Sequence, residues 1–207
     1  MAGDNGAVEQ VRLSFSDDSP GSSFFYLERI LSVQEHDDLI TGLAITPDRS
    51  KIITTSYDRS IVVLDRDNFK LITRVSEAHA DLISHAAIND GNMLCTAGND
   101  GAVLTWDMRT MLDANSSLSC IYEDLSVRPT CVKFAPKQEH QVVVGNQAGQ
   151  IQLFDIRKPK EALCEAIVDH KPITRINFQE AIFSVCSESS SLKVFEINEA
   201  STNIELT

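Results

Sequence analysis

The sequence lacks the features of several protein classes. No apolar run approaches the roughly 20 residues that a membrane-spanning helix needs, and Met1–Val11 has no basic region followed by an apolar one, as a secretory signal would. The five cysteines include no Cys-x-x-Cys pair, and their odd number indicates a reducing compartment. Cys95, Cys131 and Cys186 lie in apolar runs, where we expect them in the core. We therefore expect no membrane partner.

The chain is also poor in basic residues, with 18 Lys and Arg against 30 Asp and Glu and a net charge of −12. Nucleic-acid binding needs clustered Lys and Arg, so we expect no nucleic-acid partner. An acidic surface can attract basic protein tails over long range. It can equally do no more than keep a protein in solution, and the composition leaves both interpretations open.

Motifs of catalysis are missing as well. The sequence has no Gly-rich phosphate loop, no metal-ligand spacing among its five His and five Cys, and no Gly-x-Ser-x-Gly elbow. Two carboxylate pairs, Asp17-Asp18 and Asp37-Asp38, are most simply solvated loop acids. The sequence therefore predicts a protein that is not an enzyme, without catalytic residues, cofactor or metal.

A repeat is present instead, and its clearest copy is Gly98–Asp107. It combines a tight turn at Asn99-Asp100-Gly101 with a strand that ends in Trp106-Asp107. Weaker copies place other apolar residues at the position of the Trp: Val11, Leu64, Phe154 and Phe195. The resulting gaps are 53, 42, 48 and 41 residues. A period near 40–45 residues with a Trp-Asp dipeptide is typical of four-stranded propeller blades.

The repeat predicts an all-β fold and a single propeller domain. Four complete blades are expected at 35–77, 78–124, 125–168 and 169–207, after the end of a preceding blade and a polar loop at 1–34. Glu161–Val168 has some helical character but falls where an outer strand belongs. Four blades do not close a ring, so we expect a partial chain. Its open strand edges should make it poorly soluble or oligomeric.

Four polar and aromatic side chains of the second repeat have a spacing that suits a hydrogen-bond network. His79 precedes the first strand, Thr96 lies on the second, Asp100 lies in the next turn, and Trp106 lies on the third strand. The carboxylate can hold the imidazole ring, the ring can hold the hydroxyl, and the hydroxyl can accept the indole N–H. Such a network ties the strands of one blade together.

The same pattern recurs with losses in the other repeats. The first full repeat keeps His36, Thr54 and Asp58 but has Leu64 at the Trp position. The third repeat lacks the His and has Ala148 for the Asp. The fourth begins with His170 and has Ser189 and Phe195 at the later positions. Because the pattern recurs once per repeat, we interpret His79 and Asp100 as structural, not as a catalytic dyad.

Over nearly its whole length the chain resembles the WD-repeat β-propeller family, and within it the scaffolds that accompany type II protein arginine methyltransferases. The resembling stretches are Asp4–Glu9, Glu35–Asp38, Ala78–Ala80, Leu104–Arg109, Pro129-Thr130 and Gly145–Gly149. The resemblance implies a non-catalytic methylosome-type scaffold, located in the cytoplasm and nucleus. It would bind the methyltransferase and present Arg-rich histone or Sm-type tails for symmetric dimethylation, in histone arginine methylation and snRNP assembly. The partner-binding residues stay unknown, because the family's main contacts lie in N-terminal blades that are mostly absent here.

One further motif supports an alternative function. Trp106-Asp107-Met108-Arg109 resembles the Trp-Asp-x-Arg box of substrate receptors of cullin-type ubiquitin ligases, and Phe154-Asp155-Ile156-Arg157 is a near copy. In such receptors the Arg contacts the adaptor of the ligase. The simpler interpretation is an ion pair at the end of a strand, which contributes roughly 0–1 kcal/mol to stability.

Overall fold

The computed structural model describes residues 5–16, 24–110, 119–124, 126–136, 138–159, 161–198 and 203–206. Every regular element in these ranges is a β-strand, which confirms the predicted all-β class. The same ranges contain no helix long and apolar enough to cross a membrane. The carboxylate pair Asp17-Asp18 lies outside the described residues.

The strands form one two-stranded sheet and four four-stranded sheets. The two-stranded ribbon consists of β1 (Ala7–Ser16) and β2 (Phe24–Gln34). Blade 1 consists of β3 (Ile40–Ile45), β4 (Lys51–Ser56), β5 (Ile61–Asp65) and β6 (Leu71–Val75). Blade 2 consists of β7 (Ile83–Ile88), β8 (Met93–Gly98), β9 (Ala102–Asp107) and β10 (Ser119–Glu123). Blade 3 consists of β11 (Pro129–Ala135), β12 (Gln138–Asn146), β13 (Gln150–Asp155) and β14 (Ala162–Ile167). Blade 4 consists of β15 (Ile173–Gln179), β16 (Ile182–Ser187), β17 (Leu192–Asn198) and β18 (Asn203–Leu206).

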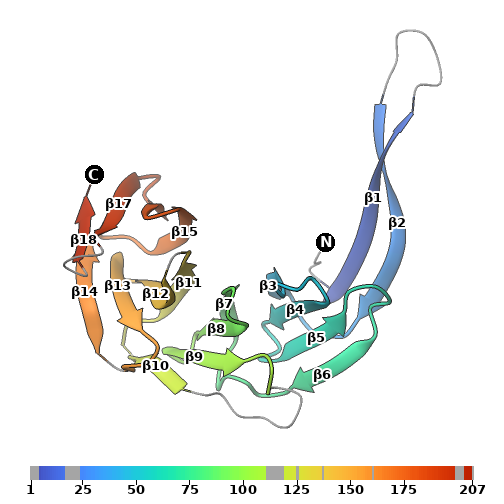
Figure 1. Ribbon diagram of the computed structural model, residues 1–207, viewed down its shortest axis with the longest axis horizontal. Coiled ribbons are helices and arrows are strands. Elements are labelled where there is room, and N and C mark those ends of the chain that lie inside the picture. Colours follow the sequence, from blue (N-terminus) through green and yellow to red (C-terminus); the bar gives the residue numbers. More distant parts are fainter. Residues whose placement is uncertain are drawn as a thin grey trace.

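Each blade is an antiparallel sheet whose strands pair in sequence order. The blades follow one another around an open arc, with β3, β7, β11 and β15 on its inner side (Figure 1). The last strand of each blade lies on the outer side, and the β1–β2 ribbon extends from one end. This arrangement confirms the predicted partial propeller of four complete blades and part of another. The stretch with helical character is the outer strand β14.

The turn between the second and third strands of each blade has the same backbone geometry. It contains one residue with positive φ: Arg59 at 68°, Gly101 at 84°, Gly149 at 81° and Ser190 at 64°. The amide of that residue donates to the carbonyl three residues earlier, at 3.2 Å in all four blades. A Cβ atom at Gly149 would lie 2.2 Å from the carbonyl oxygen of Asp169, so only glycine fits there.

The hydrophobic core is divided into layers between successive sheets. Between blades 3 and 4, Val143, Ile151 and Leu153 pack against Phe183 and Val185, and all five are buried. Similar layers lie between blades 1 and 2, between blades 2 and 3, and between the β1–β2 ribbon and blade 1. β-Branched side chains suit such layers because alternate residues of a strand point to opposite faces of the sheet.

The cysteines only partly follow the sequence prediction. Cys95 and Cys131 are buried as expected, and burial raises the pKa of Cys131 to about 12, which leaves its thiol unreactive. Cys186 is only half-buried, so its prediction as a core residue is wrong. It alternates along β16 with buried Val185 and therefore lies on the face of blade 4 that points away from blade 3.

Hydroxyl groups connect the inner strands of neighbouring blades. Each comes from the second residue of an inner strand and reaches the first residue of the next inner strand. The contacts are Thr41 Oγ1 to the carbonyl of Ile83 at 2.7 Å, Ser84 Oγ to that of Pro129 at 3.3 Å, and Thr130 Oγ1 to that of Ile173 at 2.5 Å. The same three hydroxyls also lie 3.0–3.2 Å from a carbonyl of their own sheet, and Thr174 of blade 4 makes the corresponding contact with Cys186 at 3.1 Å. The hydroxyls thus fix the spacing of successive blades at their inner edges.

Two equivalent positions test how strongly the layers stabilise the fold. Ile151 and Leu192 each occupy the same place at the start of a third strand, but Ile151 is fully buried and Leu192 is 63% exposed. We expect Ile151→Ala to lower the free energy of unfolding by about 2–5 kcal/mol, because it leaves a cavity between two sheets. Leu192→Ala should change it by no more than about 0.5 kcal/mol. Urea denaturation of both variants measures the difference, and equal losses would show that the layer between blades 3 and 4 stabilises the fold no more than an exposed face does.

Candidate functional site

In blade 2 the structure brings His79, Thr96, Asp100 and Trp106 into one chain of hydrogen bonds. The carboxylate of Asp100 lies 3.0 Å from Nδ1 of His79. Nε2 of the same ring lies 2.8 Å from Oγ1 of Thr96. The indole N–H of Trp106 donates to that hydroxyl at 2.9 Å. A neutral ring with its proton on Nδ1 satisfies every group, because Thr96 then donates to Nε2 and accepts from the indole.

The carboxylate of Asp100 is fully occupied by this structural role. It also accepts the backbone amides of Ala80 at 2.9 Å and Ala102 at 3.0 Å. Burial works against its charged form, but the hydrogen bond from His79 and these amides outweigh burial and lower the pKa of Asp100. A carboxylate held ionised by its own blade is a poor proton acceptor, so the group has the chemistry of a structural support.

Blade 1 contains a similar network with additional members. His36 contacts Thr54 at 2.8 Å, Asp58 at 3.0 Å and Ser60 at 2.9 Å. Arg74 from the outer strand β6 reaches Asp58 at 3.2 Å. The third strand offers no indole to Thr54, because Leu64 stands at the Trp position.

The charge state of this network follows from burial and hydrogen bonding. Burial lowers the pKa of His36 below 6.5, and its contact with Asp58 only partly opposes this effect. Burial disfavours the charged form of Asp58, but hydrogen bonds from Ser60, from the amide of Asp37 and from His36 outweigh it. They lower the pKa of Asp58 to about 2. The folded blade thus holds a neutral imidazole against an ionised carboxylate.

Sequence reasoning missed Ser60 and Arg74. The available signals were a serine two residues after Asp58 and the single arginine of β6. The contact of Ser60 was predictable, because a serine two residues after an aspartate commonly forms a turn in which its amide and hydroxyl donate to the carboxylate. Here they donate to Asp58 at 2.9 and 2.6 Å. The contact of Arg74 with Asp58 was not predictable, because the two residues are 16 positions apart on different parts of the blade.

Blade 4 departs from the expected pattern. The side chain of His170 is exposed, and the backbone amide of His170 donates to the carboxylate of Asp169 at 2.6 Å. Asp169 instead accepts the hydroxyls of Ser187, Ser189 and Ser191, which together lower its pKa. In this blade a carboxylate with three serines replaces the imidazole.

Blade 3 also replaces the network, as the missing His suggested. Asn146 Oδ1 accepts the amides of Ala148 and Gln150 at 3.0 Å each. Its amide group donates to the Gln150 side chain at 3.2 Å. Phe154 needs no hydroxyl partner and packs edge-on against Tyr122 of blade 2, with ring centroids 5.9 Å apart.

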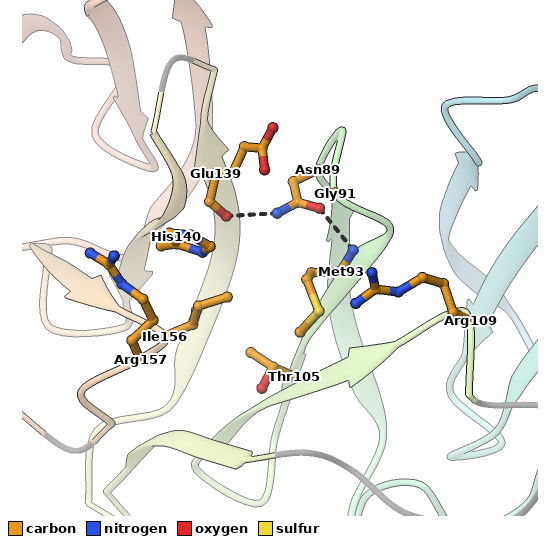
Figure 2. A pocket seen from close by; sticks show the side chains of 9 residues that line it. All are labelled: Asn89, Gly91, Met93, Thr105, Arg109, Glu139, His140, Ile156 and Arg157. Carbon is orange, nitrogen blue, oxygen red and sulfur yellow. Dashed lines mark hydrogen bonds between the residues drawn. The ribbon is translucent and has the colours of Figure 1, made fainter.

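A pocket of about 470 Å³ lies between blades 2 and 3 (Figure 2). The residues that line it are Asn89, Gly91, Met93, Thr105, Arg109, Glu139, His140, Ile156 and Arg157. The amide of Asn89 crosses the gap and donates to the backbone carbonyl of Glu139 at 2.7 Å. Arg109 and Arg157 stand at equivalent positions of the two blades, on opposite sides of the pocket.

Each of these arginines forms a two-pronged ion pair within its own blade. Nε and Nη2 of Arg109 contact Asp107 at 2.9 and 2.6 Å, and Arg157 contacts Asp155 with the same two distances. The Arg contacts lower the pKa of both carboxylates. The arginine side chains remain 67% and 64% exposed. The Trp-Asp-x-Arg box therefore presents an oriented guanidinium whose outer N–H groups can reach a partner.

In the described part of the chain, no group of three or more His, Cys, Asp or Glu side chains is arranged to hold a metal ion.

Four-stranded blades around an arc, with a complete His–Asp–Thr–Trp network in blade 2 and partial or substituted networks in the others, define a WD-repeat β-propeller protein. Comparison with known families refines this class. The sequence profile of one family, described as "Nucleolar protein 10-like, N-terminal domain", matches residues 37–207. The chain therefore belongs to this family of β-propeller domains.

Individual relatives are more distant. The methylosome protein WDR77 of Xenopus laevis is 25% identical over 169 residues, which cover 81% of this chain and 47% of that protein. A ribosome biogenesis protein WDR12 homolog of Ixodes scapularis is 24% identical over 169 residues, or 81% of this chain and 39% of that protein. The target of rapamycin complex subunit LST8 of Mus musculus is 26% identical over 148 residues, which cover 67% of this chain and 44% of that protein. The chain thus spans less than half the length of these relatives, and its membership of the WD-repeat β-propellers supports a role in protein interaction.

The blade 2 network can be tested by a double-mutant cycle. Trp106→Phe removes the indole N–H and some buried volume, and we expect it to lower the free energy of unfolding by about 1–3 kcal/mol. Thr96→Val should cost more in the wild-type chain than in the Trp106→Phe variant, because the hydrogen bond is already lost in the latter. Denaturant unfolding of all four proteins gives the coupling, and strictly additive costs would contradict the network.

The blade 1 network should make the protein sensitive to acid. The unfolded chain binds a proton at His36 near pH 6.5, whereas the folded chain binds it only at a lower pH. The stabilising contribution is therefore complete above pH 6.5 and decreases as the pH falls below it. We expect the stability gap between wild type and His36→Asn to be smaller at pH 5.5 than at pH 7.5, as measured by urea unfolding. The exposed His170→Asn control should match wild type at both pH values, and a constant gap for His36→Asn would refute the assignment.

Proposed function

We propose that this chain belongs to a non-catalytic scaffold that binds a type II protein arginine methyltransferase. In this role it presents Arg-rich tails, of the histone or Sm type, for symmetric dimethylation. The methyl transfer takes place on the partner enzyme, and the propeller supplies surfaces. The same proposal places the protein in the cytoplasm and the nucleus.

The observation that carries the proposal is a surplus of carboxylates on a β-propeller in which His79 and Asp100 have a structural role. The chain has 30 acidic and 18 basic residues, and acids such as Asp67, Asp90 and Glu188 are exposed. An acidic exterior attracts basic tails by long-range electrostatics. His79 and Asp100, which resemble a catalytic dyad in isolation, are saturated by contacts inside their blade. The similarity to the relative named methylosome protein WDR77 supports the choice of partner.

The pocket between blades 2 and 3 supports a second candidate function, that of a substrate receptor for a cullin-type ubiquitin ligase. Arg109 belongs to the Trp-Asp-x-Arg box, is 67% exposed and lines this pocket. Its fork with Asp107 fixes the direction of the guanidinium, which lowers the entropy cost of binding an adaptor. The equivalent arginine of blade 3 has the same fork without the preceding Trp.

One purification distinguishes the two candidates. The longest native form of the protein, tagged and expressed in cells, is captured from lysate and washed at high salt. We expect the eluate to dimethylate a histone-tail peptide symmetrically in the presence of S-adenosylmethionine. An eluate without this activity would overturn the scaffold proposal.

The same eluates are probed for the ligase adaptor, with two matched variants. If the receptor function holds, Arg109→Ala abolishes adaptor capture, whereas Arg157→Ala, at the equivalent position of blade 3, retains it. Equal adaptor capture by wild type and Arg109→Ala would exclude the receptor role of the box. Symmetric dimethylation of the histone-tail peptide by an eluate that contains no ligase adaptor supports only the scaffold proposal.

A further inference from the structure

The inner strands of the four blades differ in charge from the rest of the protein. Together β3, β7, β11 and β15 contain no Asp or Glu, so all 30 acidic residues lie elsewhere. They do contain three basic side chains, each on a different strand: His85 on β7, Lys133 on β11 and Arg175 on β15. We call these four strands the inner wall. A protein of net charge −12 thus has a wall without negative side chains.

Lys133 and Arg175 both act on His85. His85 is half-buried, and its Nδ1 lies 3.5 Å from the backbone amide of Val132 on the next blade. Burial, followed by the positive charges of Lys133 and Arg175, lowers the pKa of His85 to about 4. Both cations therefore lie close enough to the imidazole to oppose its protonation, and among the described residues no carboxylate forms an ion pair with either of them. A neutral ring that accepts at Nδ1 carries its proton on Nε2, where it can donate to a ligand.

Lys133 and Arg175 are also available to a partner. Both are exposed, and neither forms an ion pair with any residue of the described ranges. Arg74, Arg109 and Arg157, by contrast, are each held by a carboxylate of their own blade. An exposed pair of uncompensated cations on an otherwise acidic molecule is a local site for negative charge.

We propose that the inner wall binds an acidic peptide segment of a protein partner. The Asp or Glu side chains of the peptide contact Lys133 and Arg175, and another acceptor of the peptide accepts the N–H of His85. Charge complementarity selects this occupant, because the carboxylate-free wall attracts acidic side chains and repels basic ones.

The distribution of the donors favours a peptide over a compact anion. The three side chains come from three successive blades, so a ligand must extend along the arc to meet all of them. Basic tails are excluded from the wall by the same charges, so the proposed substrates of the methyltransferase would use the acidic exterior. The inference therefore stands independently of the proposed function.

Fluorescence anisotropy with a fluorescein-labelled peptide of alternating Glu and Gly tests this proposal on the whole chain. We expect Lys133→Ala/Arg175→Ala to bind about tenfold more weakly than wild type, since it removes two charge contacts. The control Lys70→Ala/Lys158→Ala removes the same charge from exposed loop positions outside the inner wall and should change the affinity less than twofold. The charge-preserving Lys133→Arg/Arg175→Lys should retain binding. Added salt should weaken wild-type binding.

Three results would overturn the inference. The first is equal loss of binding in the inner-wall and loop variants, which would reflect net charge alone. The second is unchanged binding by Lys133→Ala/Arg175→Ala. The third is preference of the wall for inorganic polyphosphate or single-stranded RNA over the acidic peptide, with the same dependence on Lys133 and Arg175. Thermal unfolding of each variant confirms that the fold is retained.

Discussion

The contact between neighbouring blades at their inner edges is the interaction on which the rest of the structure depends. An isolated four-stranded sheet cannot bury both of its apolar faces, so each blade needs the next one. The layer between blades 3 and 4 contains Ile151, Leu153 and Phe183, all buried. The hydroxyls of Thr41, Ser84 and Thr130 set the distance between the inner strands. Networks, pockets and the inner wall all take their positions from this stacking.

Much of the fold could be predicted from the sequence because the repeat is local. A turn, a strand and an aromatic residue recur within about ten residues, so Gly101 and Trp106 indicate a blade without knowledge of the rest. The network members His79, Thr96 and Asp100 were also predictable, since their order along the chain repeats. The contacts that replace a missing network residue were not predictable, because each of them occurs in one blade only. Asp169 substitutes for an imidazole in blade 4 through three serines.

Features between blades were beyond sequence reasoning for a different reason. The pocket beside Arg109 joins residues up to 68 positions apart, from Asn89 to Arg157, which no local pattern connects. The inner wall likewise depends on His85, Lys133 and Arg175 standing on strands that only the fold brings together. The net charge of −12 gives no sign of the inner wall, because a sum over the whole chain does not reveal a surface without carboxylates. The distribution of charged residues over the strands thus adds information that the overall composition lacks.

The repeated hydroxyl contact also bears on how the arc comes apart. Blades contact only their neighbours, so the stability of such an array approximates a sum of single-blade and nearest-neighbour contributions. Thr41, Ser84 and Thr130 each add a hydroxyl contact across one boundary between blades. Blades 2 and 3 are each packed against two described blades, so local opening of either one breaks two interfaces. Amide hydrogen exchange should accordingly be slow in these two blades, and the array should open blade by blade and not in a single cooperative step.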